Sequence, residues 1–278
     1  MSETVYLNGT FLPKEKAAVS PDDRGFIFAD GVYEVIKYYN RKPFRYADHL
    51  ERLARSLKEI QIGFEDFASL EAIFFGLLEE NKLAGVHAGI YIQITRGVNK
   101  RMHHFPEEIR PTVYAFAFAM PSFTETLEKG IKVITREDIR WLRCDIKSVA
   151  LLPNTILYNQ AVEAGAGECF LIRDGKVTEA THSSVLAVKN GTVITHPLSN
   201  LILPGITRKV ILEICAENSI PVEERALSKA ELYEIDELII AGTGSEVTPV
   251  IQVDDIPVGN KKPGEITRLL QKKFFESV

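Results

Sequence analysis

The stretch WLRCDIKSVALLPNT, residues 141–155, surrounds Lys147 with a largely apolar sequence. A lysine that acts as a nucleophile needs a lowered pKa and a sheltered position, and desolvation of the ammonium group favours both. A lysine in such a segment can equally extend its stem along a half-buried strand and leave the ammonium in water. Lys147 is therefore a candidate catalytic residue, and motifs elsewhere in the chain must decide between the two interpretations.

Three further motifs lie C-terminal to Lys147. VTEATHSSV, residues 177–185, places Glu179 after a short predicted strand, although a solvated turn position would also explain this carboxylate. In LILPGITRKV, residues 201–210, Gly205 precedes a predicted helix start, where backbone N–H groups and the helix dipole favour phosphate binding. AGTGSEVTP, residues 241–249, can offer more donors to the same anion. An ordinary helix start and an ordinary glycine turn are the alternatives for these last two motifs.

The composition is that of a globular protein, with 278 residues of which 45% are hydrophobic and 26% charged. A formal net charge of -5 lacks the basic excess of nucleic-acid-binding proteins, so nucleic acid is not an expected partner. Three cysteines without metal-like spacing indicate no metal site and no disulfide framework, and they favour a reducing cytoplasm. The N-terminus lacks an apolar leader and no apolar run reaches membrane-spanning length, so neither secretion nor a membrane span is expected.

Hydrophobic periodicity and turn residues predict two domains, at residues 1–119 and 125–278, joined by the linker MPSFT at 120–124. In the first domain Asn8-Gly9 predicts a hairpin, and Asp48 is placed to cap a helix. The predicted strands of this domain are 4–7, 10–12, 31–39, 88–95 and 111–119, and its helices are 47–59 and 70–81. In the second domain, strands at 131–135, 168–172, 185–188 and 238–241 alternate with helices near 151–164, 206–218 and 265–276.

Between two predicted strands lies RGVNKRMHHFPEEIR, residues 96–110, hereafter the polar segment. It is too charged for a core element, so we expect a loop that presents functional groups. Arg101 and His103 are two residues apart and point the same way if the loop is extended there. A basic, solvated loop is the alternative interpretation.

Taken together and in this order, the motifs resemble those of the fold type IV aminotransferases, which use pyridoxal 5'-phosphate. The resemblance covers nearly the whole chain and is closest to the D-amino-acid aminotransferase branch. It is carried by DRGFIFADGVYEV (23–35), TRGVNKRMH (95–103), EDIRWLRCDIKS (137–148), GITR (205–208) and SEVTPVI (245–251). It implies a mixed α/β (α+β) fold with a smaller N-terminal α/β domain, a larger C-terminal pseudo-barrel domain that binds the cofactor, and the cofactor at the domain interface.

The resemblance also implies roles for individual residues. Lys147 would hold the cofactor as a Schiff base and shuttle the substrate proton, and Glu179 would hydrogen-bond the pyridine nitrogen and keep the ring protonated. Leu203 would pack against one face of the ring. The cofactor phosphate would be bound by Arg52, by backbone groups of Ile206 and Thr207, and by Thr243.

For the substrate, the resemblance implies a carboxylate trap formed by Arg101 and His103 of the neighbouring subunit of a homodimer, together with Tyr33.

The chain departs from the family pattern at residues 180–182, Ala-Thr-His, where the D-amino-acid enzymes have glycine and serine. His182 would then touch the cofactor's substituents or face solvent. Glu179 is intact, so the departure concerns fine tuning of the cofactor.

The implied reaction moves the amino group of a D-amino acid, such as D-alanine, to a 2-oxo acid, such as 2-oxoglutarate, in a ping-pong cycle. A branched-chain L-amino-acid aminotransferase is the alternative within the family, and the Arg101-x-His103 pair favours the D-amino-acid reading. An aminodeoxychorismate-lyase-type enzyme shares the lysine and glutamate and ranks lower. A non-catalytic binding protein on the same scaffold is the alternative from another class, and the retention of Lys147, Glu179 and Arg52 argues against it.

Overall fold

The computed structural model describes residues 3–120 and 123–278, whose contacts divide into two compact units. The first unit comprises Met1–Ser122 and Ile146–Ala150, and the second comprises Phe123–Asp145 and Leu151–Val278. The short segment that carries Lys147 thus contacts the first unit, although the predicted boundary put it in the second domain. Of the expected linker 120–124, residues 121–122 lie outside the described residues.

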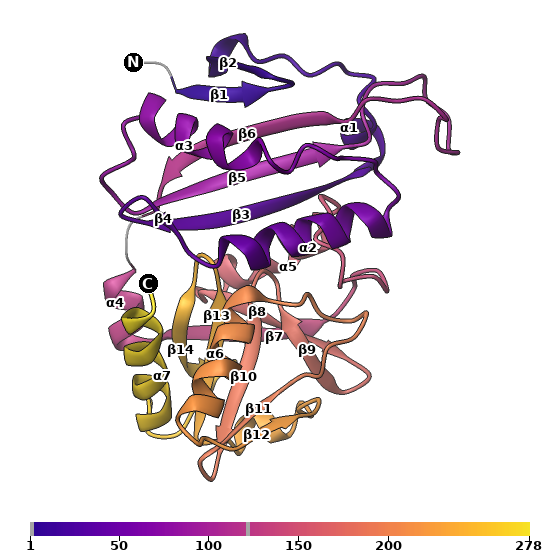
Figure 1. The fold of residues 1–278 in the computed structure, drawn as a ribbon. Coiled ribbons are helices and arrows are strands. Elements are labelled where there is room, and N and C mark those ends of the chain that lie inside the picture. Colours follow the sequence, from indigo (N-terminus) through magenta and orange to yellow (C-terminus); the bar gives the residue numbers. More distant parts are fainter. Residues whose placement is uncertain (1–2, 121–122) are drawn as a thin grey trace. The chain divides into compact units, whose positions relative to one another are not determined.

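The first unit is built on an antiparallel sheet (Figure 1) of order β2-β1-β6-β5-β3-β4. Its strands are β1 (Thr4–Leu7), β2 (Thr10–Pro13), β3 (Gly31–Tyr39), β4 (Lys42–Pro43), β5 (Ala88–Thr95) and β6 (Thr112–Ala119). The predicted hairpin is confirmed, since β1 pairs with β2 across Asn8 and Gly9, which both have positive φ. The neighbouring β3, β5 and β6 form the centre of the sheet, where β5 pairs along its whole length with both of its neighbours.

The helices of this unit are α1 (Arg24–Phe28), α2 (Tyr46–Glu59) and α3 (Leu70–Glu80), with a 3-10 turn η1 at Lys14–Lys16. Apolar side chains of α2 and α3 share one buried cluster with β3 and β5. The expected capping role of Asp48 is wrong. The helix begins at Tyr46, which places Asp48 inside its first turn, and its N-cap is Arg45 in a left-handed conformation. The Asp48 carboxylate pairs instead with the Arg45 side chain.

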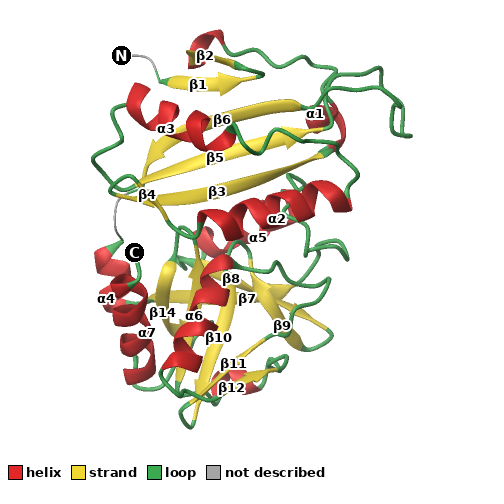
Figure 2. Cartoon of the chain, viewed as in Figure 1, coloured by secondary structure: helices red, strands yellow, loops and turns green. Residues whose placement is uncertain are grey.

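The second unit contains a mixed sheet that curls into a half-barrel (Figure 2), in the order β12-β11-β10-β13-β14-β7-β8-β9, with β15 paired to β14. Its strands are β7 (Ile131–Glu137), β8 (Glu168–Arg173), β9 (Lys176–Ala180), β10 (Ser184–Lys189), β11 (Thr192–Thr195), β12 (Val222–Glu224), β13 (Glu237–Gly242), β14 (Glu246–Val253) and β15 (Ile256–Pro257). Parallel pairing joins β11 to β12 and β7 to both β14 and β8, and the other pairs are antiparallel. This mixed α/β architecture confirms the expected fold class.

The helices of the second unit are α4 (Thr124–Lys129), α5 (Leu152–Glu163), α6 (Ile206–Glu217) and α7 (Glu265–Glu276), with a 3-10 turn η2 at Glu231–Tyr233. The three long helices lie where periodicity predicts them. One apolar cluster fills the curl of the sheet, and a smaller one lies between α5 and strands β7 and β8. Within the described part of the chain, no helix is both long and apolar enough to cross a membrane.

Candidate active site

Lys147 is held on β3 by main-chain hydrogen bonds. Its carbonyl accepts from the Tyr33 N–H at 3.0 Å, and the Val149 N–H donates to the Gly31 carbonyl at 3.1 Å. The Lys147 N–H donates to Oγ of Ser56 on α2 at 3.2 Å. The side chain is half-buried, and Nζ lies 4.2 Å from the centroid of the Tyr33 ring. The backbone of Lys147 is therefore fixed independently of its side-chain amine.

Arg52, on α2, faces a fully buried carboxylate on β3. Its Nε and Nη2 donate to the two Glu34 oxygens at 2.9 and 2.7 Å, and His49 Nδ1 lies 3.1 Å from the same carboxylate. Burial alone would raise the pKa of Glu34, but Arg52 and His49 outweigh it and hold that pKa well below its usual range. Glu34 thus fixes the orientation of the Arg52 guanidinium on α2.

The predicted substrate residues of the polar segment meet at one aromatic ring. The Phe28 ring centroid lies 5.3 Å from the Arg101 guanidinium carbon and 5.5 Å from the centre of the His103 ring. Both side chains are exposed in the single chain. Tyr33 lies on β3, where its ring stacks on Tyr91 at 5.6 Å. The structure therefore brings Arg101 and His103 together and places Tyr33 beside Lys147.

In the second unit, Glu179 lies near the end of β9 and is buried. One oxygen accepts from Nη1 of Arg140, and the other accepts from the Leu203 N–H at 3.1 Å. Burial raises the pKa of Glu179, and Arg140 and the Leu203 amide oppose that rise. Leu203, predicted to pack on a cofactor ring, is thus bonded to the residue predicted to bind that ring's nitrogen.

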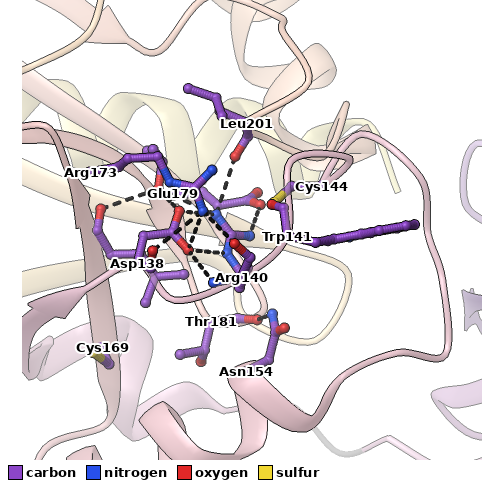
Figure 3. Close-up of polar contacts among 12 residues, drawn as sticks. Asp138, Arg140, Trp141, Cys144, Asn154, Cys169, Arg173, Glu179, Thr181 and Leu201 are labelled. Atoms are coloured by element: carbon purple, nitrogen blue, oxygen red, sulfur yellow. Dashed lines mark hydrogen bonds and ion pairs between the residues drawn. The ribbon is translucent and has the colours of Figure 1, made fainter. Parts of the chain in front are cut away.

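Arg140 is a site residue that sequence reasoning missed. Figure 3 shows its guanidinium between Asp138 and Glu179. Nε and Nη2 of Arg140 donate to the two Asp138 oxygens, each at 2.9 Å, and Arg173 Nη2 lies 3.2 Å from Asp138. The available signal was the spacing of Asp138 and Arg140 within the quoted motif, because residues two apart in extended backbone face the same side.

The predicted phosphate site combines the start of α6 with the turn after β13. The first backbone N–H groups of α6 have no partner within the helix, and the N-cap is Gly205, which has no side chain to bond them. A Cβ on Gly205 would stand 2.6 Å from Oγ of Ser184, which pairs across the sheet with Ala241. Ile206, Thr207 and Thr243 therefore lie near the same end of the sheet, as the predicted phosphate site requires.

At residues 180–182, where the chain departs from the family pattern, two side chains contact a buried carboxylate. Glu168, at the start of β8, accepts from both N–H and Oγ1 of Thr181, and His182 Nδ1 lies 2.8 Å from its second oxygen. The His182 ring also contacts Tyr158 of α5 edge-on, with centroids 5.1 Å apart. These contacts tie His182, which is half exposed, to Glu168 and α5. Cys144 is a buried thiol whose pKa burial raises to about 11, so it is a packing residue rather than a reactive thiolate.

Comparison with known proteins places this geometry in a family. The profile described as "Amino-transferase class IV" matches residues 31–253. The chain belongs to the class IV aminotransferases. It is 44% identical to a D-alanine aminotransferase of Staphylococcus haemolyticus over 97% of this chain and 96% of that one. The corresponding enzyme of Bacillus licheniformis is 40% identical, over 99% and 96% of the two chains.

Solved structures of class IV aminotransferases agree with the fold. A branched-chain amino acid aminotransferase of Escherichia coli superposes with a TM-score of 0.92 at 27% identity, covering 99% of this chain and 94% of that one. The PLP form of the branched-chain enzyme of Thermobaculum terrenum gives a TM-score of 0.86 at 26% identity, covering 99% and 93%. The resemblance in the sequence motifs and the fold predicted from it are thereby confirmed.

Proposed function

We propose that this class IV aminotransferase transfers the amino group of a D-amino acid, such as D-alanine, to a 2-oxo acid, such as 2-oxoglutarate, with pyridoxal 5'-phosphate as cofactor. The observation that carries the proposal is the 40–44% identity to D-alanine aminotransferases over nearly the full length of both chains. The exposed pair Arg101 and His103 supports it, because two cationic or hydrogen-bonding groups around one ring suit an α-carboxylate.

The donor groups of the chain fit the cofactor. The buried Glu179 carboxylate is matched to a protonated pyridine nitrogen, the open start of α6 to a phosphate, and the Lys147 amine to an aldehyde. When bound, pyridoxal phosphate supplies an electron sink for the carbanion left by removal of the substrate α-proton. Each remaining task falls to side chains and backbone groups of the protein.

In this proposal Lys147 binds the cofactor and carries the proton between substrate and cofactor carbons. Glu179 would accept a hydrogen bond from the ring N–H, and Arg140 opposes the rise in the Glu179 pKa that burial causes. Leu203 packs on the ring. The phosphate is held by Arg52, whose orientation Glu34 fixes, and by Ile206, Thr207 and Thr243. Tyr33, Arg101 and His103 bind the substrate carboxylate. The protein acts in the cytoplasm as a homodimer in which Arg101 and His103 serve the neighbouring subunit.

A branched-chain L-amino-acid aminotransferase is the second candidate, favoured by the similarity to solved structures of such enzymes. With 2-oxoglutarate as acceptor, we expect kcat/KM for D-alanine to exceed that for L-leucine by at least about 100-fold. When the α-carboxylate is held in a fixed trap, the two enantiomeric classes direct the α-proton differently toward Lys147. The measurement is a paired assay of glutamate formation. Preference for L-leucine would establish the second candidate and exclude the first.

The dimer can be tested by mixing two impaired variants, assayed at a D-alanine concentration well below the KM of Arg101→Leu. Lys147→Ala lacks the catalytic amine and Arg101→Leu lacks the trap, so each homodimer should be impaired. If the trap serves the neighbouring subunit, a mixed dimer contains one site with both wild-type residues. Random co-assembly should then restore about a quarter of wild-type D-alanine turnover, since about half of the dimers are mixed and half of their sites are intact. No recovery on mixing would mean that the trap acts within its own chain.

A further inference from the structure

The short helix α1 (Arg24–Phe28) is fixed against the ends of β5 and β6. Asp23 caps it by accepting from the Gly25 N–H at 2.8 Å, and its other oxygen accepts from the hydroxyls of Thr95 and Thr112 at 3.0 and 2.6 Å. A Cβ on Gly25 would stand 2.2 Å from Cγ2 of Thr95, so the glycine is required for this close approach. These two threonines flank the polar segment, so α1 is joined to both of its ends.

Arg24 extends from α1 into the middle of the polar segment. Its backbone N–H donates to the Gly97 carbonyl at 2.9 Å, and its side-chain Nη1 donates to the Met102 carbonyl at 2.6 Å. Met102 lies between Arg101 and His103 in the chain. The side chain of Arg24 is buried, so this bond is shielded from water and fixes the backbone that carries both trap residues.

A second arginine completes the arrangement. Asp30 accepts from Nε of Arg24 at 2.7 Å and from Nε and Nη2 of Arg96 at 2.8 and 2.9 Å. Arg96 also donates to the carbonyls of residues 60 and 61, at the end of α2. Phe105, in the polar segment, covers the Arg96 guanidinium, with the ring centroid 3.5 Å from its carbon. Arg24, Asp30, Arg96 and Phe105 together are called the loop clamp below.

We propose that the loop clamp positions the carboxylate trap, with Arg24 as a positioning residue that sets the affinity for α-carboxylate substrates without touching them. Arg24 holds the main chain of the trap by its hydrogen bond to the Met102 carbonyl, and Phe28 of the same helix lies against both trap side chains. An exposed loop that is held in its binding geometry before substrate arrives loses less conformational entropy on binding. The inference rests on the proposed role of Arg101 and His103.

The test is the holoenzyme variant Arg24→Met, which removes the bonds to Met102 and Asp30 while keeping an extended side chain. We expect KM for D-alanine, and the inhibition constant of propionate as an unreactive carboxylate, to rise about tenfold, the loss of one charge-assisted hydrogen bond. The kcat at saturation and the cofactor absorbance should stay near wild type, and Arg24→Lys should recover part of the affinity. A merely structural role would instead lower the thermal midpoint and the active fraction with unchanged KM.

A double-mutant cycle separates positioning from independent effects. If Arg24 acts through the trap, Arg24→Met should add little to the KM of Arg101→Leu. Arg41→Met is the matched control, since Arg41 pairs with Glu79 at the surface, and it should leave KM unchanged. Phe105→Ala, at an exposed ring of the clamp, should raise KM in the same direction and decides the matter if Arg24→Met does not fold.

Two results would overturn the inference: an unchanged propionate constant in Arg24→Met and Phe105→Ala, or effects of Arg24→Met and Arg101→Leu that simply add. Failure of the proposed function is distinct, because the wild-type protein would then not turn over D-alanine.

Discussion

Replacement of Lys147 by alanine is expected to lower kcat for D-alanine transamination by at least about 10³-fold, because proton transfer by a positioned side chain alone contributes roughly 10²–10⁴-fold. The fold should survive, since the hydrogen bonds of Lys147 to Tyr33 and Ser56 are made by its backbone, which alanine retains. Single-turnover mixing with D-alanine, followed by cofactor absorbance, measures the effect, and a thermal melt checks the fold.

Two companion experiments sharpen this prediction. Lys147→Arg keeps the positive charge but replaces the amine, and it should be as inactive as the alanine variant. Added ethylamine should partly restore proton transfer in Lys147→Ala, because a free amine can enter the space left by the side chain. Near-wild-type turnover in either variant would remove Lys147 from the catalytic centre.

Replacement of Glu179 by glutamine is the second large effect. Glutamine keeps the shape but cannot stabilise a protonated ring nitrogen by charge. A hydrogen bond to a charged group contributes about 1.5–3 kcal/mol, so kcat should fall roughly 10–150-fold. The cofactor should remain bound through its phosphate contacts. Steady-state kinetics measures the effect on kcat, and cofactor titration measures the effect on cofactor binding. An unchanged kcat would show that Glu179 does not act on the ring.

The pH dependence of the Arg140 variants extends the same prediction. Burial raises the pKa of Glu179 and Arg140 opposes that rise, so Arg140→Met should raise this pKa further. Glu179 can hold a protonated ring nitrogen only when ionised, so activity is lost as the pH falls through its pKa. The acidic limb of the kcat profile should therefore move to higher pH in Arg140→Met and stay near wild type in Arg140→Lys. Removal of one partner from a buried pair is destabilising, which makes the lysine variant the necessary comparison.

Local structure was largely predictable from the sequence. Asn8-Gly9 specified a hairpin because both residues adopt positive φ, and apolar periodicity located the long helices. The start of α2 was misplaced, because a left-handed Arg45 took the capping position that Asp48 suggested. Such an error is local, since several residues near a helix start compete for the same role.

Charged partners from distant elements were not predictable. Glu34 and Arg52 are 18 residues apart, on a strand and a helix, and Arg140 reaches Glu179 across 39 residues. The pattern of a single element does not report which buried charge faces it from another element. The sequence therefore indicated Arg52 and Glu179 as candidate functional groups, without the ionic partners that orient them.

By itself the sequence determined the family and the candidate functional groups: Lys147, Glu179, the GITR and GTGSE turns, and the Arg101-x-His103 pair. The tertiary structure alone decided where Lys147 is anchored. Residues 146–150 join β3 of the first unit by backbone hydrogen bonds rather than remaining with the strands that precede them in the chain. The physical reason is that residue types and short spacings indicate which side-chain chemistry is available. Backbone pairing between segments more than 100 residues apart depends instead on how the whole chain folds.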